Sequence, residues 1–218
     1  MIITGCNDQE TPAPSGSKAS SFTFLELGAN TLYSKSVRSK LGDSLGPVAV
    51  ARKTPIDLDV NYPGFIEAYF KPIYHRNQQL NDATGARREH DTIKLMYRYP
   101  QQKSRLFKKV ELLFSNQSKK PLCFKIVAGK EGAEIIDAMR EKYGSPKETK
   151  WSHEPGVSYS WEKDRDLLIV SRVLDRFGDP EYRIVIYYGT NIDELIETEL
   201  RQIQQSEENR KKAGRSAF

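Results

Sequence analysis

The sequence contains few residues that could form disulfides or bind metals, with only two cysteines and three histidines among 218 residues. Two cysteines are too few for a disulfide-stapled small domain or for a zinc ribbon, which needs four thiolates. The histidines, His75, His90 and His153, lie far apart in the sequence and give no metal-ligand spacing. We therefore expect neither a bound metal nor a cofactor.

Long hydrophobic runs are also absent. The longest aliphatic runs resemble Leu167–Val170, far below the ~20 apolar residues that a membrane-spanning helix needs. Hydrophobic residues make up 38% of the chain, which is lean but sufficient for a core, because a folded chain of this length buries roughly 70% of its unfolded surface. This composition argues against wholesale disorder and fits one large domain or two small repeated units.

The first six residues carry a pattern that is typical of a protein-targeting signal. Ile3-Thr4-Gly5-Cys6 consists of an aliphatic residue, two small residues and a cysteine, and it resembles the lipobox of bacterial lipoproteins. In that family the signal peptide is cleaved before the cysteine, which then carries acyl chains. The resemblance implies that residues 1–6 are a residual signal peptide with its lipobox: Cys6 is the lipid attachment point, and residues 1–5 are cleaved off as the end of a signal peptide, most of which would lie upstream of Met1.

The residues after the cysteine agree with this interpretation. Residues 7–21 are rich in Pro, Ser and Gly, a composition that predicts a flexible tether between the anchor and a folded body at 22–204. Several acyl chains, at about 0.8 kcal/mol per buried methylene, would hold the protein firmly in a membrane. We therefore expect a palmitate-bearing protein of the cell envelope that faces the periplasm or the cell exterior. The alternative is an ordinary amino terminus with a chance cysteine.

The body shows alternating strand and helix patterns, which predict an α+β fold with an antiparallel sheet and packed helices. In the segment 92–99, for example, Ile93, Leu95 and Tyr97 alternate with polar or flexible residues, as in a strand with one solvated face. The predicted strands cover residues 22–27, 65–71, 92–99, 106–115, 122–128, 157–161, 167–174 and 182–188. The predicted helices cover residues 33–41 (ended by Gly42), 130–143 and 190–203. Residues 77–88 are predicted to form a loop, and residues 205–218 a frayed polar tail.

The segment Phe22–Gly42 resembles Phe124–Gly144, because each has a strand pattern, a glycine and then a helix pattern ended by Lys-Leu-Gly or Lys-Tyr-Gly. This arrangement predicts two helix-then-strands repeats with a boundary near residue 121. It is similar to the repeat of small outer-membrane lipoproteins and β-lactamase-inhibitor-like domains. That resemblance implies a binding or structural module rather than an enzyme, and it transfers no functional residue. Two unrelated glycine-ended helices are the alternative.

The string Gly42-Asp43-Ser44-Leu45-Gly46 matches the serine motif of two hydrolase families, G-x-S-x-G and Gly-Asp-Ser-Leu. In both families the serine must stand on a sharp strand-to-helix turn and must have a histidine base. Here Ser44 follows a predicted helix, and no histidine has an aspartate three residues before it. We expect a polar turn at this position; a serine esterase acting through Ser44 is the enzymatic alternative.

Positive charge is concentrated in one part of the chain. Residues 86–125 contain eleven Lys and Arg but three Asp and Glu, a net charge of +8 against +5 for the whole sequence. Several of these side chains fall on the solvated faces of predicted strands, which predicts a basic surface. Its candidate binding residues are Arg87, Arg88, Lys94, Arg98, Lys103, Arg105 and Lys109.

Three interpretations of this basic surface are open. In the first, it is a solvated sheet edge that lysines protect from aggregation. In the second, it contacts anionic envelope material, such as lipid head groups or a polyanionic wall component, or another envelope protein. The third interpretation is a soluble protein that binds nucleic acid, which a pI of about 9.0 permits. Elsewhere in the body, Cys123 is expected to be a half-buried structural thiol, and Trp161 a core residue.

Overall fold

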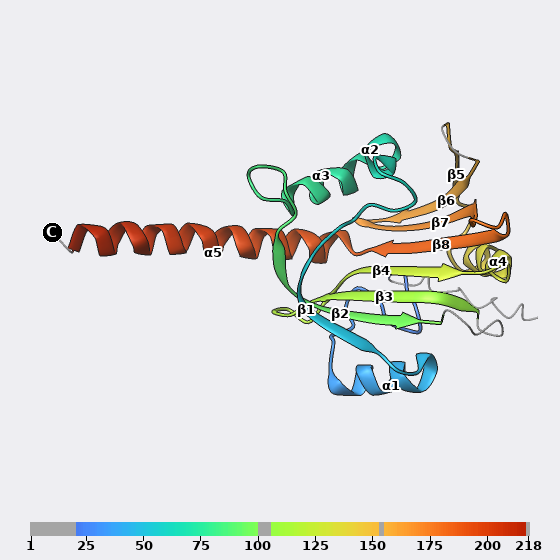
Figure 1. Ribbon diagram of the computed structural model, residues 1–218, viewed down its shortest axis with the longest axis horizontal. Coiled ribbons are helices and arrows are strands. Elements are labelled where there is room, and N and C mark those ends of the chain that lie inside the picture. Colours follow the sequence, from blue (N-terminus) through green and yellow to red (C-terminus); the bar gives the residue numbers. More distant parts are fainter. Residues whose placement is uncertain (1–20, 100–105, 153–154, 217–218) are drawn as a thin grey trace, which may run out of the picture.

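The computed structural model describes residues 21–99, 106–152 and 155–216 of the chain. Within these ranges, eight strands form a single antiparallel sheet with the order β1-β2-β3-β4-β8-β7-β6-β5 (Figure 1). The strands are β1 (Ala49–Pro55), β2 (Glu89–Arg98), β3 (Phe107–Ser115), β4 (Pro121–Ala128), β5 (Lys147–Lys150), β6 (Val157–Lys163), β7 (Asp166–Leu174) and β8 (Pro180–Tyr187). The expected α+β fold with an antiparallel sheet is confirmed.

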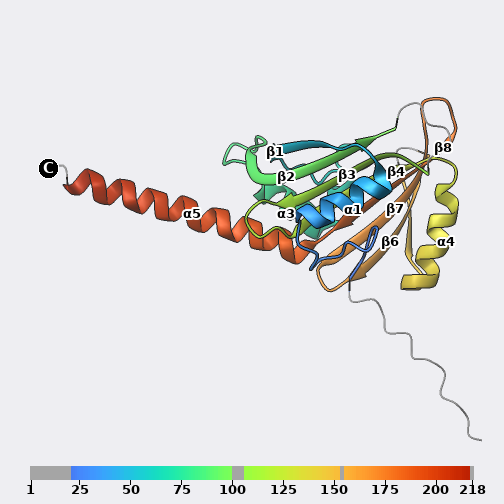
Figure 2. The ribbon, with the colours of Figure 1, turned by 90° about the horizontal axis from the view of Figure 1, so that it is seen from below.

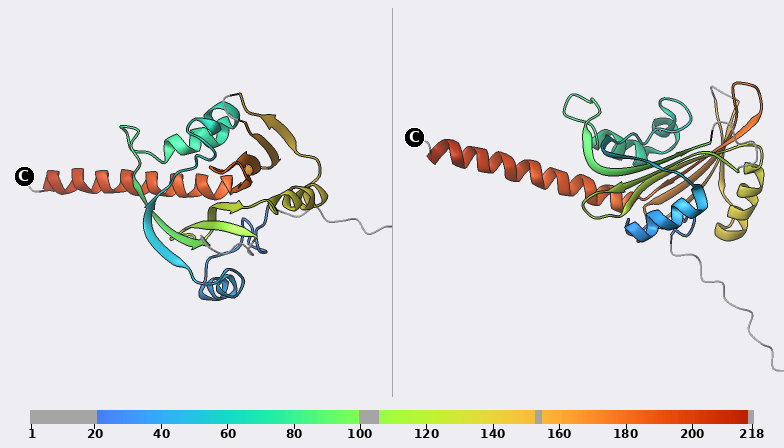
Figure 3. Two further views of the ribbon diagram at one scale, coloured as in Figure 1. Left: turned by 45° about the vertical axis from the view of Figure 1, so that its right-hand side comes forward. Right: turned by 60° about the horizontal axis from the view of Figure 1, so that its bottom comes forward.

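Helices cover both faces of the sheet. They are α1 (Lys35–Leu45), α2 (Phe65–Tyr69), α3 (Lys71–Gln79), α4 (Gly132–Tyr143) and α5 (Gly189–Ser216). Helices α1 and α4 lie on one face, while α2 and α3 lie on the opposite face (Figures 2 and 3). Helix α5 begins beside α3 on that second face and then extends away from the sheet (Figure 1).

The sheet has two halves of similar construction. Each half is a helix followed by four antiparallel strands, α1 with β1–β4 and α4 with β5–β8, and α2 and α3 are inserted between β1 and β2. The halves join through their last strands, where Phe124 lies opposite Ile186 and Ile126 opposite Ile184. This pairing places the most apolar strands in the middle of the sheet and the polar strands β1 and β5 at its edges.

Strand periodicity divides the core into two layers, because successive side chains of a strand point to opposite faces. Leu95, Leu112 and Phe124 lie in the layer covered by α1 and α4. Val185 and Tyr187 lie in the layer covered by α2, α3 and the first turns of α5. The expectation that one face is solvated is therefore only partly correct: the second face is covered over β7 and β8 but polar over β2 and β3.

Two of the predicted strands are wrong. Residues 65–71 form α2 and the start of α3, because Ile66, Phe70 and Ile73 recur at the helical spacings of four and three and face the core. Pro72 also occupies the first turn of α3, where its fixed φ angle favours a helix. Residues 22–27 form a turn that a single bridge closes between Phe24 and Leu27.

Several element boundaries also differ from the predictions. Helix α1 continues past Gly42 to Leu45, since Leu41 and Leu45 are one turn apart and both are buried; Gly46, at φ 82°, then ends the helix. The predicted loop at 77–88 begins too early, because α3 runs to Gln79. The edge strands β1 and β5 lie in regions where no strand was expected, since their exposed residues carry no hydrophobic alternation.

The prediction of a frayed tail after residue 204 is wrong, because α5 continues to Ser216. Side chains of residues 205–213 are exposed, and the exposure begins earlier in the helix, with Leu200 at 50%. The residues are good helix formers, and Glu207 and Glu208 precede Lys211 and Lys212 by four positions, a spacing that stabilises a solvated helix.

None of the helices within the described ranges is both long enough and apolar enough to cross a membrane.

Candidate functional site

Arg87 and Arg88, the first two predicted binding residues, are engaged in ion pairs. Arg87 Nη2 lies 2.7 Å from Asp57 Oδ1, and a second nitrogen of its guanidinium donates to the side chain of Asn77. Arg88 Nη2 lies 2.8 Å from Glu199 Oε2 of α5. These two arginines hold the segments around α3 and α5 together, so they do not extend the basic surface.

Three other predicted residues, Lys94, Arg98 and Lys109, are brought together on the face of the sheet that carries α2 and α3. The remaining ones, Lys103 and Arg105, lie outside the described residues, as does Cys6. Strand pairing adds two further cations to this face. We call the resulting surface the cationic face; its cations are Lys94, Arg98, Lys109, Lys125 and Arg183.

The register shows how four strands build the cationic face. Arg98 of β2 lies opposite Lys109 of β3. Lys109 lies opposite Val127 of β4, and Val127 lies opposite Arg183 of β8. Directly opposed residues on paired strands share one face. One row of side chains across the sheet therefore carries three cations, and Lys125 stands in the adjacent row.

A cavity of about 260 Å³ opens in the cationic face. Lys94, Lys109 and Lys125 stand around it, and Leu113 and Cys123 belong to its lining. Lys125 Nζ donates to the backbone oxygens of Asp57 and Asp59, at 2.8 and 2.7 Å. This contact fixes the chain segment between β1 and α2 at the margin of the cavity.

Carboxylates partly balance the cations: Glu111 and Glu181 lie on the strands, and Asp57, which pairs with Arg87, also lines the cavity. Glu111 Oε1 lies 3.0 Å from Lys109 Nζ and 3.5 Å from Lys94 Nζ. Burial alone would raise the pKa of the Glu111 carboxyl, but the hydrogen bond from Lys109 and the charge of Lys94 hold this pKa below its usual value. Arg183 pairs with Glu181 at 3.1 Å. Arg98 is exposed and has no hydrogen-bond or ion-pair partner among the described residues, so the face retains an excess of positive charge.

Parts of the cationic face could have been found from the sequence. Lys125 alternates with the apolar Phe124 and Ile126, so period-two spacing alone predicts a solvated position. Arg183 follows much later in the chain, and only the pairing of β4 with β8 brings it to the same face.

The structure also places the other residues considered from the sequence, which are Ser44, Trp161 and Cys123. Ser44 is exposed in the last turn of α1 and does not stand on a strand-to-helix turn. Trp161 is a core residue, as expected. Cys123 is more buried than expected, with 3% of its surface exposed. Burial raises the pKa of the Cys123 thiol to about 12, so the thiol stays protonated and unreactive.

Among the residues that the structure describes, no group of three or more His, Cys, Asp or Glu side chains could hold a metal ion.

Comparison of the chain with protein-family models, with curated proteins and with solved structures finds no match. The residues themselves are therefore the basis for a function: they form an α+β protein with a cationic sheet face.

Proposed function

We propose that this protein is an acylated, membrane-anchored module of the bacterial cell envelope that binds phosphate-bearing anionic material and is not an enzyme. The observation that supports binding is the cationic face, on which Lys94, Arg98 and Lys109 stand together beside a cavity. The sequence Ile3-Thr4-Gly5-Cys6 supports the anchor. In this proposal the protein faces the periplasm or the cell exterior.

The arrangement of charges favours a ligand with several anionic groups. Adjacent strands lie about 4.8 Å apart, so cations in one row and in neighbouring rows can contact several phosphates at once. Arg98, which has no partner among the described residues, offers a planar fork that matches phosphate geometry. An anchor at Cys6 would keep this face close to head groups or wall polymers, which raises their effective concentration.

Binding to anionic vesicles tests the role of the cationic face. The full chain with Cys6→Ser, which cannot be acylated, is expected to co-sediment with phosphatidylglycerol vesicles but not with phosphatidylcholine vesicles. Each lysine near an anionic surface contributes about 1 kcal/mol. Loss of the two lysine charges alone should therefore weaken binding about 30-fold, and the glutamates of the double variant Lys94→Glu/Lys109→Glu should weaken it further.

The matched control is Lys35→Glu/Lys40→Glu, which makes the same charge change on α1 at the opposite face. Equal loss in the two double variants would contradict the proposed site, because it would show an effect of net charge alone. Inorganic polyphosphate as a soluble competitor separates a polymer ligand from a head group. Retention on an oligonucleotide that falls steeply with salt, without vesicle binding, would favour the nucleic-acid alternative.

The anchor is tested by cell fractionation. When a precursor with the natural upstream sequence is expressed, the protein should partition into the membrane fraction, and Cys6→Ser should release it. Cys123→Ala is the control, because that thiol is buried and has no role in anchoring. Mass spectrometry that finds an unmodified Cys6 on a chain beginning with Met1 would overturn this part of the proposal.

A further inference from the structure

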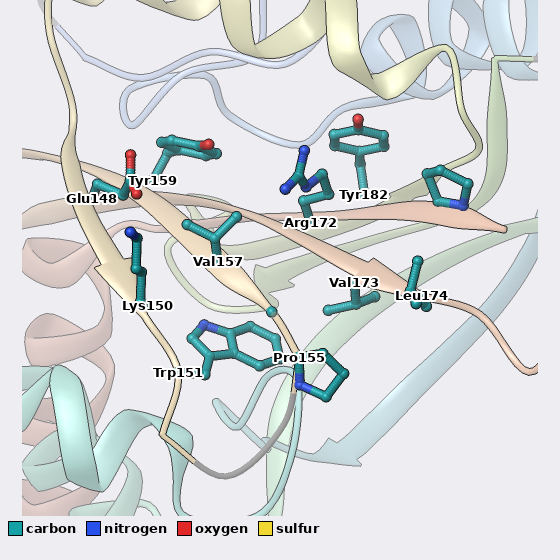
Figure 4. A pocket seen from close by; sticks show the side chains of 12 residues that line it. Glu148, Lys150, Trp151, Pro155, Val157, Tyr159, Arg172, Val173, Leu174 and Tyr182 are labelled. Atoms are coloured by element: carbon teal, nitrogen blue, oxygen red, sulfur yellow. The ribbon is translucent and has the colours of Figure 1, made fainter. Parts of the chain in front are cut away.

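A second hollow lies at the opposite end of the sheet from the long part of α5, over strands β5 to β8 (Figure 4). Its volume is about 630 Å³, within the range of pockets that hold small organic ligands. We call it the aromatic pocket and define it by Lys150, Trp151, Tyr159, Arg172 and Tyr182. None of these residues belongs to the cationic face.

Strand register assembles this pocket. Lys150 of β5 lies opposite Val157 of β6, Val157 opposite Arg172 of β7, and Arg172 opposite Tyr182 of β8. These four side chains form one row across four strands on the face that carries α4. Tyr159 stands two positions further along β6 on the same face, and Figure 4 shows its ring beside the hollow.

Tyr182, on the face that carries α4, and Trp151, which belongs to the layer under α2 and borders the hollow from that side, are both held in place before any ligand binds. A Cβ atom on Gly156 would lie 2.4 Å from the Trp151 ring, and one on Gly132 would lie 2.4 Å from the Tyr182 ring. Both glycines thus permit the rings to pack against backbone. Trp151 Nε1 also donates to Ser158 Oγ at 2.9 Å. A pocket whose walls are already ordered binds with a smaller loss of side-chain entropy.

The pocket also contains two cations that lack partners among the described residues. Arg172 is exposed, and among the described residues neither Arg172 nor Lys150 has a hydrogen-bond or ion-pair partner. Glu148 lies on the edge strand β5 opposite Tyr159, so it stands in the row next to the one that contains Arg172. The guanidinium of Arg172 is therefore available to an anion, with the Tyr182 ring next to it and the exposed Leu174 two positions along the same strand.

We propose that the aromatic pocket binds a small organic anion, in which a carboxylate or phosphate is attached to a flat aromatic or apolar body. The oxyanion would pair with Arg172, whose planar fork matches both groups in a bidentate manner. The apolar body would pack against the half-buried Tyr159 and the exposed Leu174, beneath which Tyr182 and Val157 are buried. This site does not depend on the cationic face or on acylation of Cys6.

Three matched probes test this proposal by isothermal titration of the full chain: naphthoate, naphthyl phosphate and the neutral naphthamide. A charge-assisted hydrogen bond is worth about 1.5–3 kcal/mol, so at least one of the two anions should bind about tenfold or more tightly than naphthamide. The relative affinity of the two anions identifies the preferred oxyanion. Arg172→Gln should abolish the preference for the anion while leaving the affinity for naphthamide nearly unchanged.

Arg98→Gln on the opposite face is the control and should bind all three probes as the natural sequence does. Because Arg172 and Arg98 are both exposed, neither substitution is expected to impair folding, which circular dichroism checks. Three results would overturn the proposal: no saturable binding of either anion at millimolar concentration, equal affinity for the anions and the amide, or unchanged anion affinity in Arg172→Gln. If Lys94→Glu/Lys109→Glu abolishes vesicle binding but keeps naphthoate binding, the two sites are independent.

Discussion

Gly189→Ala is expected to destabilise the protein by about 3 kcal/mol, because its added Cβ would overlap the backbone. Gly189 is the first residue of α5, and a Cβ there would lie 2.0 Å from the Arg165 carbonyl oxygen and 2.9 Å from its carbon. No side-chain rotation relieves a clash with backbone, so the turn between β6 and β7 must move away from α5. The Gly189 N–H also donates to Asp166 Oδ1 at 3.0 Å, a contact that this movement would break.

Gly42→Ala is the matched control for that substitution. Gly42 lies inside α1, and a Cβ there would have no atom within 4 Å. Alanine in a helix interior is more stable than glycine by roughly 0.5–1 kcal/mol, so this variant should gain stability. Urea unfolding followed by circular dichroism measures both free energies. A Gly189→Ala variant as stable as the natural sequence would show that the approach of α5 to Arg165 is not tight.

Glu199→Ala is the second substitution with a large expected effect, about 2 kcal/mol of lost stability together with loosening of α5. Glu199 Oε2 lies 2.9 Å from Nδ1 of His90 and 2.8 Å from Nη2 of Arg88. His90 is 1% exposed, and its other ring nitrogen lies 2.9 Å from the backbone oxygen of Leu80. Without the carboxylate, a buried imidazole nitrogen and a guanidinium both lose their partner.

Hydrogen exchange of α5 amides measures the loosening, and urea unfolding measures the free energy. Faster exchange is expected around residue 199 and along the exposed extension of α5. Glu197→Ala is the control, since this exposed carboxylate has no partner among the described residues. Equal exchange in the two variants would indicate that Glu199 does not hold α5 against β2.

The strands that the sequence predicts correctly are those with at least one buried face. In β2, Ile93, Leu95 and Tyr97 alternate with Lys94, Met96 and Arg98, and the buried face follows this alternation. The same period locates β3, and continuous apolar runs locate β7 and β8. Helix α4 is predicted well because it has a clear apolar stripe and ends at Gly144, which has φ 87°.

The wrong predictions have equally local causes. A short aromatic run such as 65–71 does not distinguish a strand from a buried helix by periodicity. Edge strands β1 and β5 bury little on either side, so their sequences show no alternation. The extension of α5 has no apolar stripe, because its helical state follows from propensity and charge spacing rather than from packing.

The sequence identifies only part of the cationic face, because a count of charges does not show which cations are already in ion pairs. Arg87 and Arg88 belong to the same dense region as Lys94, yet acids from distant segments, Asp57 and Glu199, neutralise them. Only after these pairs are removed does the cationic face stand out as a candidate site.

By itself, the sequence determined that the chain is an α+β protein, that its positive charge is concentrated in residues 86–125, and that Cys6 lies in a lipobox-like pattern. These features are local, and each can be read from neighbouring residues or simple periodicity. Only the tertiary structure decided that β4 pairs with β8, that Arg183 joins Lys109 on one face, and that Arg172 meets Tyr182 in a pocket. The physical reason is that strand pairing and helix docking join residues far apart in the chain, and the residues between them do not encode that pairing in any local period.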